Sequence, residues 1–136
     1  MIHEPISFTI HLAPITKKNS QRMIHAKGRM IPIPSKQYIS YEREAWNFMP
    51  MVREPIDYPV NVRAIYYMPT RRRVDLTNLH EALHDILVKY QIISDDNCRI
   101  IVGTDGSRVF YDKEHPRTEV HIEEMDERPY QLKMEW

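Results

Sequence analysis

Residues 75–90, DLTNLHEALHDILVKY, constrain this fold most, because they have the spacing of an amphipathic α-helix. At about 100° per residue the apolar side chains fall on one face, which predicts that this face packs in the core. The residues of this face are Leu76, Leu79, Leu83, Ile86, Leu87 and Tyr90.

Strands are predicted on both sides of this helix. Residues 6–12 and 60–68 alternate apolar and polar side chains, as half-buried strands do. Lys27-Gly28 separates two β-prone runs and suggests a hairpin. Shorter strands are expected around residues 99–102, 107–111 and 118–123.

A second helix is predicted before the 60–68 strand. Ser35 is placed to cap it, and apolar residues at helical spacing continue to about Phe48. The pattern predicts an α+β fold over residues 1–136, as a single small domain with a mixed β-sheet and two main helices packed on it.

Composition excludes a membrane span. The 42% apolar content is ordinary for a soluble fold, and no apolar run approaches the roughly 20 residues that a membrane helix requires. The N-terminal residues do not match a secretory signal, and the single cysteine, Cys98, has no partner for an internal disulfide. We therefore expect a cytoplasmic protein with no membrane partner.

Positive charge is concentrated in two segments, although the net charge of the chain is zero. Residues 14–36 hold six basic and no acidic residues, and three consecutive arginines follow at 71–73. Residues 112–136 supply the opposing charge, with eight acidic residues against four basic. Such a chain can bind a polyanion on one face; the alternative is that these runs are solvated surface.

A stripe of polar side chains lies beside the apolar face of the 75–90 helix. It consists of Asp75, Asn78, Ala82, Asp85 and Lys89, with Glu81 one step off its edge. Asp95 and Asp96 follow the helix closely and are expected to approach its flank. Carboxylate and amide oxygens suit Mg²⁺ or Mn²⁺, so the stripe predicts a site for a hard metal ion. The alternative is that Asp75 only caps the helix and that Asp95-Asp96-Asn97 is a polar turn.

His80, Glu81 and His84 on the same helix match HExxH, the pattern of zinc metalloproteases. The extended form of that motif needs a glycine where this chain has Leu87 and a further histidine, and none occurs before His115. Two ligands leave a zinc site incomplete, so a zinc metalloprotease ranks as the third hypothesis.

The run 71–96, RRRVDLTNLHEALHDILVKYQIISDD, resembles the core of the RusA-type Holliday junction resolvases. In that family basic residues precede D-L-D-N-L, a lysine, D-A-L and a D-D pair. The segments PITKKNSQR and DGSRVFYDKEHPR also resemble phage-type relatives. The resemblance implies a RusA-like fold and a homodimeric, Mg²⁺-dependent endonuclease that nicks opposed strands of four-way DNA junctions in recombination and repair.

The resemblance assigns family residues to positions of this chain. The family's first aspartate, asparagine, helix aspartate and acidic pair fall on Asp75, Asn78, Asp85 and Asp95-Asp96. Two positions depart from the pattern, because the second catalytic aspartate is Thr77 here and the catalytic lysine is Glu81. A lysine that stabilises charge on the phosphate would then come from Lys17, Lys18 or Lys113.

We therefore expect a structure-specific DNA endonuclease. The expected catalytic residues are Asp75, Asp95, Asp96 and Glu81, and these four with Asp85 and Asn78 are the expected ligands of Mg²⁺, or of Mn²⁺ in its place. The expected contacts to branched DNA are Arg71, Arg72, Arg73, Lys17, Lys18, Arg22 and Lys113. The second hypothesis is a protein that binds branched DNA with weak or no cleavage, because of the changes at Thr77 and Glu81.

Overall fold

The alternating residues of segment 60–68 form the central strand of the molecule. The computed structural model describes residues 3–17 and 22–126, and β4, Val60–Met68, has the bounds that its alternation predicts. Val60, Val62, Ala64 and Tyr66 are all buried, on one face of β4. Arg63, which points to the other face, is exposed.

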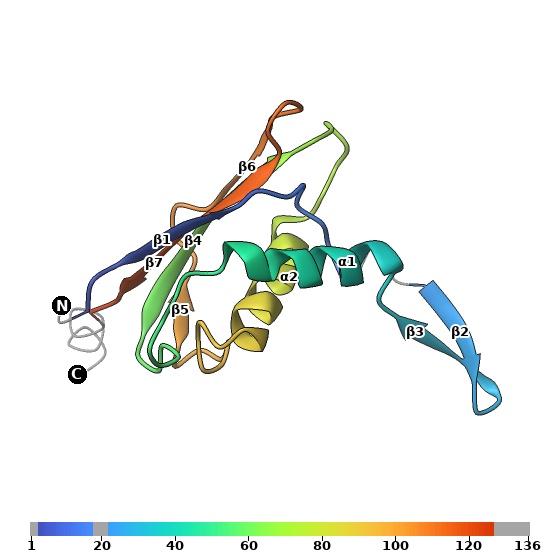
Figure 1. The fold of residues 1–136 in the computed structure, drawn as a ribbon, viewed down its shortest axis with the longest axis horizontal. Helices are drawn as coiled ribbons and strands as arrows, with labels where there is room; N and C mark the ends of the chain where they lie inside the picture. The colour runs from blue at the N-terminus through green and yellow to red at the C-terminus, as the bar shows by residue number, and fades with distance from the viewer. Residues whose placement is uncertain (1–2, 18–21, 127–136) are drawn as a thin grey trace, which may run out of the picture.

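β4 belongs to a five-stranded mixed sheet with the order β1-β7-β4-β5, in which β6 also pairs with β4. β7 (Arg117–Glu124) runs antiparallel to both β1 (Ile6–Ile10) and β4. β5 (Ile101–Gly103) and β6 (Arg108–Tyr111) each run parallel to β4. The last of these strands in the sequence is therefore inserted between the first and β4 (Figure 1).

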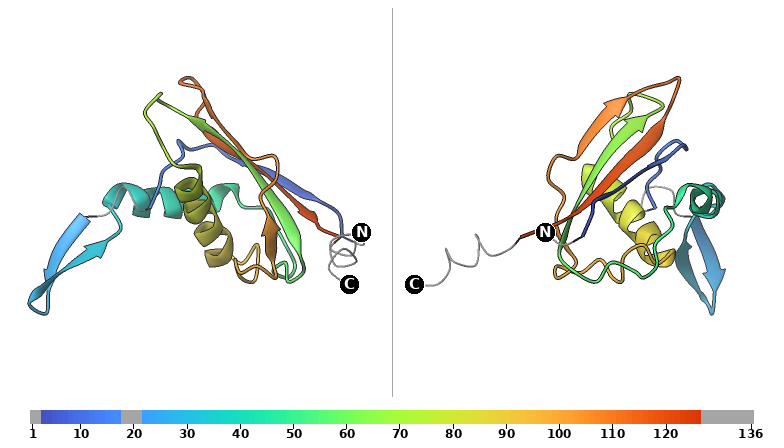
Figure 2. Two further views of the ribbon diagram at one scale, coloured as in Figure 1. Left: turned by 180° about the vertical axis from the view of Figure 1, so that it is seen from behind. Right: turned by 60° about the vertical axis from the view of Figure 1, so that its left-hand side comes forward.

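Two α-helices, α1 (Lys36–Ala45) and α2 (Leu76–Lys89), lie on one face of the sheet (Figures 1 and 2). Ser35 caps α1 as predicted, with its hydroxyl accepting a hydrogen bond of 3.0 Å from the backbone N–H of Tyr38. The α-helix ends three residues before Phe48, and the chain continues as a 3₁₀ turn, η2 (Trp46–Phe48). The predicted α+β class, with a mixed sheet and two main helices, is confirmed.

The apolar face of α2 forms the core together with the inner face of β4. Leu79, Leu83, Ile86 and Leu87 are each at most 2% exposed and belong to the same apolar cluster as the buried residues of β4. Leu76, predicted on this face, is 36% exposed. The first buried residue of the helix is Leu79, one turn later. In the described part of the chain, no helix has the length and apolarity to cross a lipid bilayer.

A hairpin of β2 (Arg22–Ala26) and β3 (Arg29–Ile33) projects from the body at the start of α1 (Figure 1). Its turn has positive φ at both residues, 51° at Lys27 and 75° at Gly28, which matches the twist of a two-residue hairpin. The predicted hairpin is confirmed.

Leu83→Ala is expected to lower the free energy of unfolding by about 2–5 kcal/mol, because it leaves a cavity in an enclosed core. Leu76→Ala removes the same atoms from an exposed position of the same helix and should cost about 1 kcal/mol or less. Urea denaturation followed by circular dichroism measures both losses. Equal losses would contradict the buried face described above.

Candidate functional site

The C-terminal half of α2 and the loop after it carry three carboxylates. Asp85 lies on α2, and Asp95 and Asp96 lie on the exposed loop that follows. The negative charge of Asp85 is the smallest of the causes that raise the pKa of Asp96. We call Asp85, Asp95 and Asp96 the acidic group.

Asp95 and Asp96 have pKa values that move in opposite directions. The backbone N–H of Asp96 and the side-chain amide of Asn97 donate to the two carboxylate oxygens of Asp95, at 2.7 and 3.0 Å, and they lower its pKa. Partial desolvation, a hydrogen bond with Asp95 and the charges of Asp95 and Asp85 raise the pKa of Asp96. A nearby cation would favour the ionised form of Asp96 and so oppose this upward shift.

A lysine lies against the acidic group. Nζ of Lys17 is 3.3 Å from Oδ2 of Asp85 and 6.0 Å from the centre of the Tyr38 ring. Both side chains of the ion pair are more than a third exposed, at 37% and 35%, so the pair contributes little to stability. Its main effect is to place a positive charge among the carboxylates.

Asp75 lies at the opposite end of α2, where it is the N-cap residue. Its carboxylate makes no capping hydrogen bond and instead accepts one of 3.4 Å from the side-chain amide of Asn78. Asp85 follows Asp75 by ten positions, a rise of about 15 Å along the helix axis. The predicted stripe is thus divided into the acidic group and a second set of oxygen donors at the start of α2.

Metal ligation was predicted for both sets. Among residues 3–17 and 22–126, no three His, Cys, Asp or Glu side chains are arranged as a ready-made metal site. Mg²⁺ usually takes one or two carboxylates and completes its shell with water and phosphate oxygens. The acidic group has the donor chemistry for that kind of coordination. Glu81, also predicted as a ligand, is exposed on α2.

The arginine run lies in the connection from β4 to α2. Arg71, Arg72 and Arg73 are exposed, and none of the described carboxylates forms an ion pair with them. The guanidinium of Arg71 lies over the ring of Tyr111, 4.2 Å from its centre. This contact could not be predicted from the sequence, because Tyr111 follows in a strand predicted only by its β propensity. The charge of the run is available to an anionic partner.

The other predicted DNA contacts are placed separately. Lys113 is exposed in the connection between β6 and β7. Lys18 lies outside the described residues, and Arg22 belongs to β2 with its side chain outside them. These positions stay predictions.

The two histidines of the HExxH motif belong to the interior. The Tyr66 hydroxyl and Nδ1 of His80 share a hydrogen bond of 2.8 Å, and the rings of His80 and His84 stack at 5.5 Å. Burial lowers the pKa of His80; burial and the neighbouring His80 lower the pKa of His84 to about 4. No third ligand joins them in the described part of the chain, so the three-ligand site of a zinc protease is not formed there.

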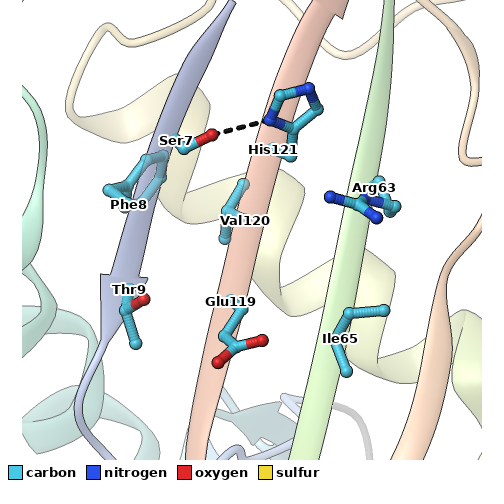
Figure 3. A pocket seen from close by; sticks show the side chains of 8 residues that line it. All are labelled: Ser7, Phe8, Thr9, Arg63, Ile65, Glu119, Val120 and His121. Carbon is cyan, nitrogen blue, oxygen red and sulfur yellow. Dashed lines mark hydrogen bonds between the residues drawn. The ribbon is translucent and has the colours of Figure 1, made fainter.

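A hollow of about 310 Å³ lies on the face of the sheet turned away from the helices (Figure 3). It is lined by Ser7, Phe8, Thr9, Arg63, Ile65, Glu119, Val120 and His121. Two of its polar side chains pair with each other, since the Ser7 hydroxyl lies 2.6 Å from Nδ1 of His121. The hollow is separate from the acidic group, which lies on the helix side.

Two comparisons with known proteins point to the same family. The family model described as Endodeoxyribonuclease RusA matches residues 12–123, a range that includes the arginine run, Asp75 and the acidic group. A protein of Aquifex aeolicus (strain VF5) called crossover junction endodeoxyribonuclease RusA is 28% identical over 105 residues. That similarity covers 76% of this chain and 83% of the relative.

The buried histidines predict how stability depends on pH. Because both pKa values are lowered in the fold, the unfolded chain takes up protons first, and stability is lost as pH falls from about 6.5 toward about 4. His84→Gln should flatten this loss, measured by urea denaturation between about pH 7.5 and pH 4.5. His25→Gln, at an exposed hairpin position, is the control. The same slope in His84→Gln as in the wild type would contradict the prediction.

Proposed function

The chain belongs to the RusA endodeoxyribonuclease family, and from that membership we propose that it is a metal-dependent endonuclease that resolves four-way DNA junctions or nicks related branched DNA. The observation that carries the proposal is the ion pair of Lys17 with Asp85, at 3.3 Å, on the helix that leads into the loop of Asp95 and Asp96. The name of the Aquifex relative, a crossover junction endodeoxyribonuclease, supports a branched substrate. Recombination and repair are the processes that such an activity serves.

The donor set of the acidic group fits Mg²⁺, with Mn²⁺ as an alternative. Asp95 and Asp96 supply adjacent carboxylates, and Asp85 adds a third negative charge from α2. When bound, such an ion lowers the pKa of a coordinated water and neutralises charge on the scissile phosphate. The two N–H donors on Asp95 keep that carboxylate ionised and oriented.

Other residues of the chain bind and orient the phosphodiester. The exposed arginines at 71–73 present planar donors that suit phosphate oxygens. Lys17 supplies a positive charge beside Asp85. In the family pattern this role belongs to a lysine at the position of Glu81 in this chain. Lys18, Arg22 and Lys113 extend the proposed DNA contacts.

Asp75 and Asn78, with Glu81 one turn further along, form the second set of oxygen donors, next to the arginine run. About 15 Å of helix separates Asp75 from Asp85, so a single ion cannot contact both within one chain. We propose that this second set acts on the phosphate held by the arginines, and that Asp75 and Glu81 are its catalytic carboxylates.

We also propose a homodimer. Nicking two opposed strands of a junction requires two copies of the site, and twofold symmetry supplies them in matching orientation.

A protein that binds branched DNA with weak or no cleavage is the second candidate. The specific observation that favours it is the pair of departures from the family pattern, Thr77 for an aspartate and Glu81 for a lysine.

Wild-type protein with Mg²⁺ is expected to place paired nicks in a labelled four-way junction. Asp96→Asn and Asp75→Asn should each lower the nicking rate by about 100-fold or more, because a lost carboxylate removes charge stabilisation at the reacting phosphate. Denaturing gels of end-labelled strands measure the nicks, with and without a chelator. Asp57→Asn, an exposed carboxylate outside both sets, is the matched control.

The outcomes of that experiment separate the candidates. Tight, salt-sensitive binding without nicks in either ion would favour the branched-DNA-binding protein. Nicking that survives both Asp96→Asn and Asp75→Asn would remove these carboxylates from the mechanism.

Replacing Arg71, Arg72 and Arg73 together by alanine is expected to weaken junction binding and to flatten its dependence on salt. Each lost phosphate contact should reduce the slope of log K against log salt by about 0.9. Fluorescence anisotropy at several salt concentrations measures the slope. Arg53→Ala, an exposed arginine in another loop, should leave it unchanged. An unaltered slope in the triple variant would take the run out of the interface.

A further inference from the structure

The strand β6 ends in two exposed aromatic side chains. Phe110 is 51% exposed and Tyr111 is 39% exposed, although aromatic side chains of this size are usually mostly buried. Among the described strands β6 pairs only with β4, so both side chains lie at an open edge of the sheet. Neither has a part in the site described above, apart from the contact of Tyr111 with Arg71.

A row of flat side chains runs inward from this edge on the face away from the helices. Tyr67 of β4 is the register partner of Phe110 on one side and of Arg117 on the other, so the three side chains share a face. The ring centres of Tyr67 and Phe110 are 5.8 Å apart. The guanidinium of Arg117 lies 3.8 Å from the centre of the Tyr67 ring. The row continues the surface of the hollow in Figure 3, through the neighbouring Ile65 and Glu119.

The guanidinium of this row is held in place. Arg117 donates to Oδ2 of Asp112 and to Oε2 of Glu119, both at 3.0 Å, and it also donates to the backbone carbonyl of His115. The guanidinium plane of Arg117 over the Tyr67 ring is therefore already ordered, which reduces the side-chain entropy lost when a partner binds.

The edge is joined to the arginine run. Arg71 lies over the ring of Tyr111, the residue after Phe110, and Arg72 and Arg73 follow it without carboxylate partners in the described part of the chain. Because successive strand residues point to opposite faces, Tyr111 and Arg71 lie on the helix side of the strand end that carries Phe110 on its other side. Positive charge suited to phosphate thus lies at the same edge of the sheet as the exposed rings, on the opposite face from Phe110. We call Tyr67, Phe110 and Tyr111, with Arg71 and Arg117, the aromatic edge.

We propose that the aromatic edge is a stacking platform for unstacked nucleobases, and that it receives bases at the branch point of the DNA. Aromatic rings and guanidinium planes both accept the face of a base, whatever its identity. Bases inside an intact duplex are stacked on each other and unavailable, so the platform distinguishes branched or single-stranded DNA from duplex. The branch-point part of this inference rests on the proposed function.

An open strand edge could also pair with the same edge of a second copy of the chain. Charge argues against it, because the arginines at 71–73, which have no carboxylate partner among the described residues, would bring like charges of two copies together across a symmetric contact. The same arginines complement a polyanion.

Phe110→Leu tests the platform, since leucine keeps an apolar side chain and removes the ring. Fluorescence anisotropy without divalent ions measures binding to an oligothymidylate single strand, a four-way junction and a fully paired duplex. We expect binding of the single strand and the junction to weaken by about five- to 150-fold, the range of base–aromatic stacking, with duplex binding within about twofold. Phe110→Trp should restore binding. Trp46→Ala removes another exposed ring, at 60% exposure on η2, and should change nothing.

Three outcomes would overturn the proposal: wild-type affinity of Phe110→Leu for all three DNAs, an equal loss for duplex, or dissociation of an oligomer by light scattering. Its failure is distinguishable from that of the proposed function. Ring-dependent binding of the single strand by a protein that neither binds nor nicks junctions would support the platform and reject the resolvase. Normal nicking of junctions and wild-type binding of all three DNAs by Phe110→Leu would support the resolvase and reject the platform.

Discussion

The packing of α2 against the inner face of β4 is the contact on which the rest of the structure depends. Four nearly inaccessible side chains, Leu79, Leu83, Ile86 and Leu87, fix the rotation of the helix about its axis. That rotation decides where every other side chain of α2 points. Asp85 is consequently held at the boundary between core and solvent, where it pairs with Lys17. The same helix therefore supplies the core and the chemistry.

Local periodicity predicted the elements well, because it reports which face of an element is apolar. It gave β4 with its observed bounds, α2 to within one residue at each end, and the hairpin around Lys27-Gly28. Periodicity does not report which neighbour covers that face. The order of the strands, the parallel pairing of β5 and β6 and the exposure of Leu76 depend on that neighbour, so none of them could be predicted.

The candidate site was predictable where its parts are close in sequence. The short return after α2 led us to expect Asp95 and Asp96 near the helix, which stays a prediction. The run 71–96 carried the resemblance that the family match confirms. Contacts between distant segments, such as Lys17 with Asp85, left no trace in the sequence. The HExxH motif shows what spacing alone does not predict. It correctly indicates that two imidazoles lie on one side of a helix. The hydrogen bond between the buried Tyr66 hydroxyl and Nδ1 of His80 depends on a neighbouring strand and could not be predicted from the motif.

The position of β7 in the sheet has a consequence for synthesis. Ile6 at the start of β1 pairs with Ile122 of β7, and β7 also pairs along nearly the whole of β4. On the ribosome β1, β4 and α2 all emerge before the strand that joins them, and pairing across so long a stretch of chain is slow because the intervening loop must close. The nascent chain therefore displays its arginines and carboxylates before it has a sheet to hold them. Translation that stops short of β7 would leave those charged residues without a folded site.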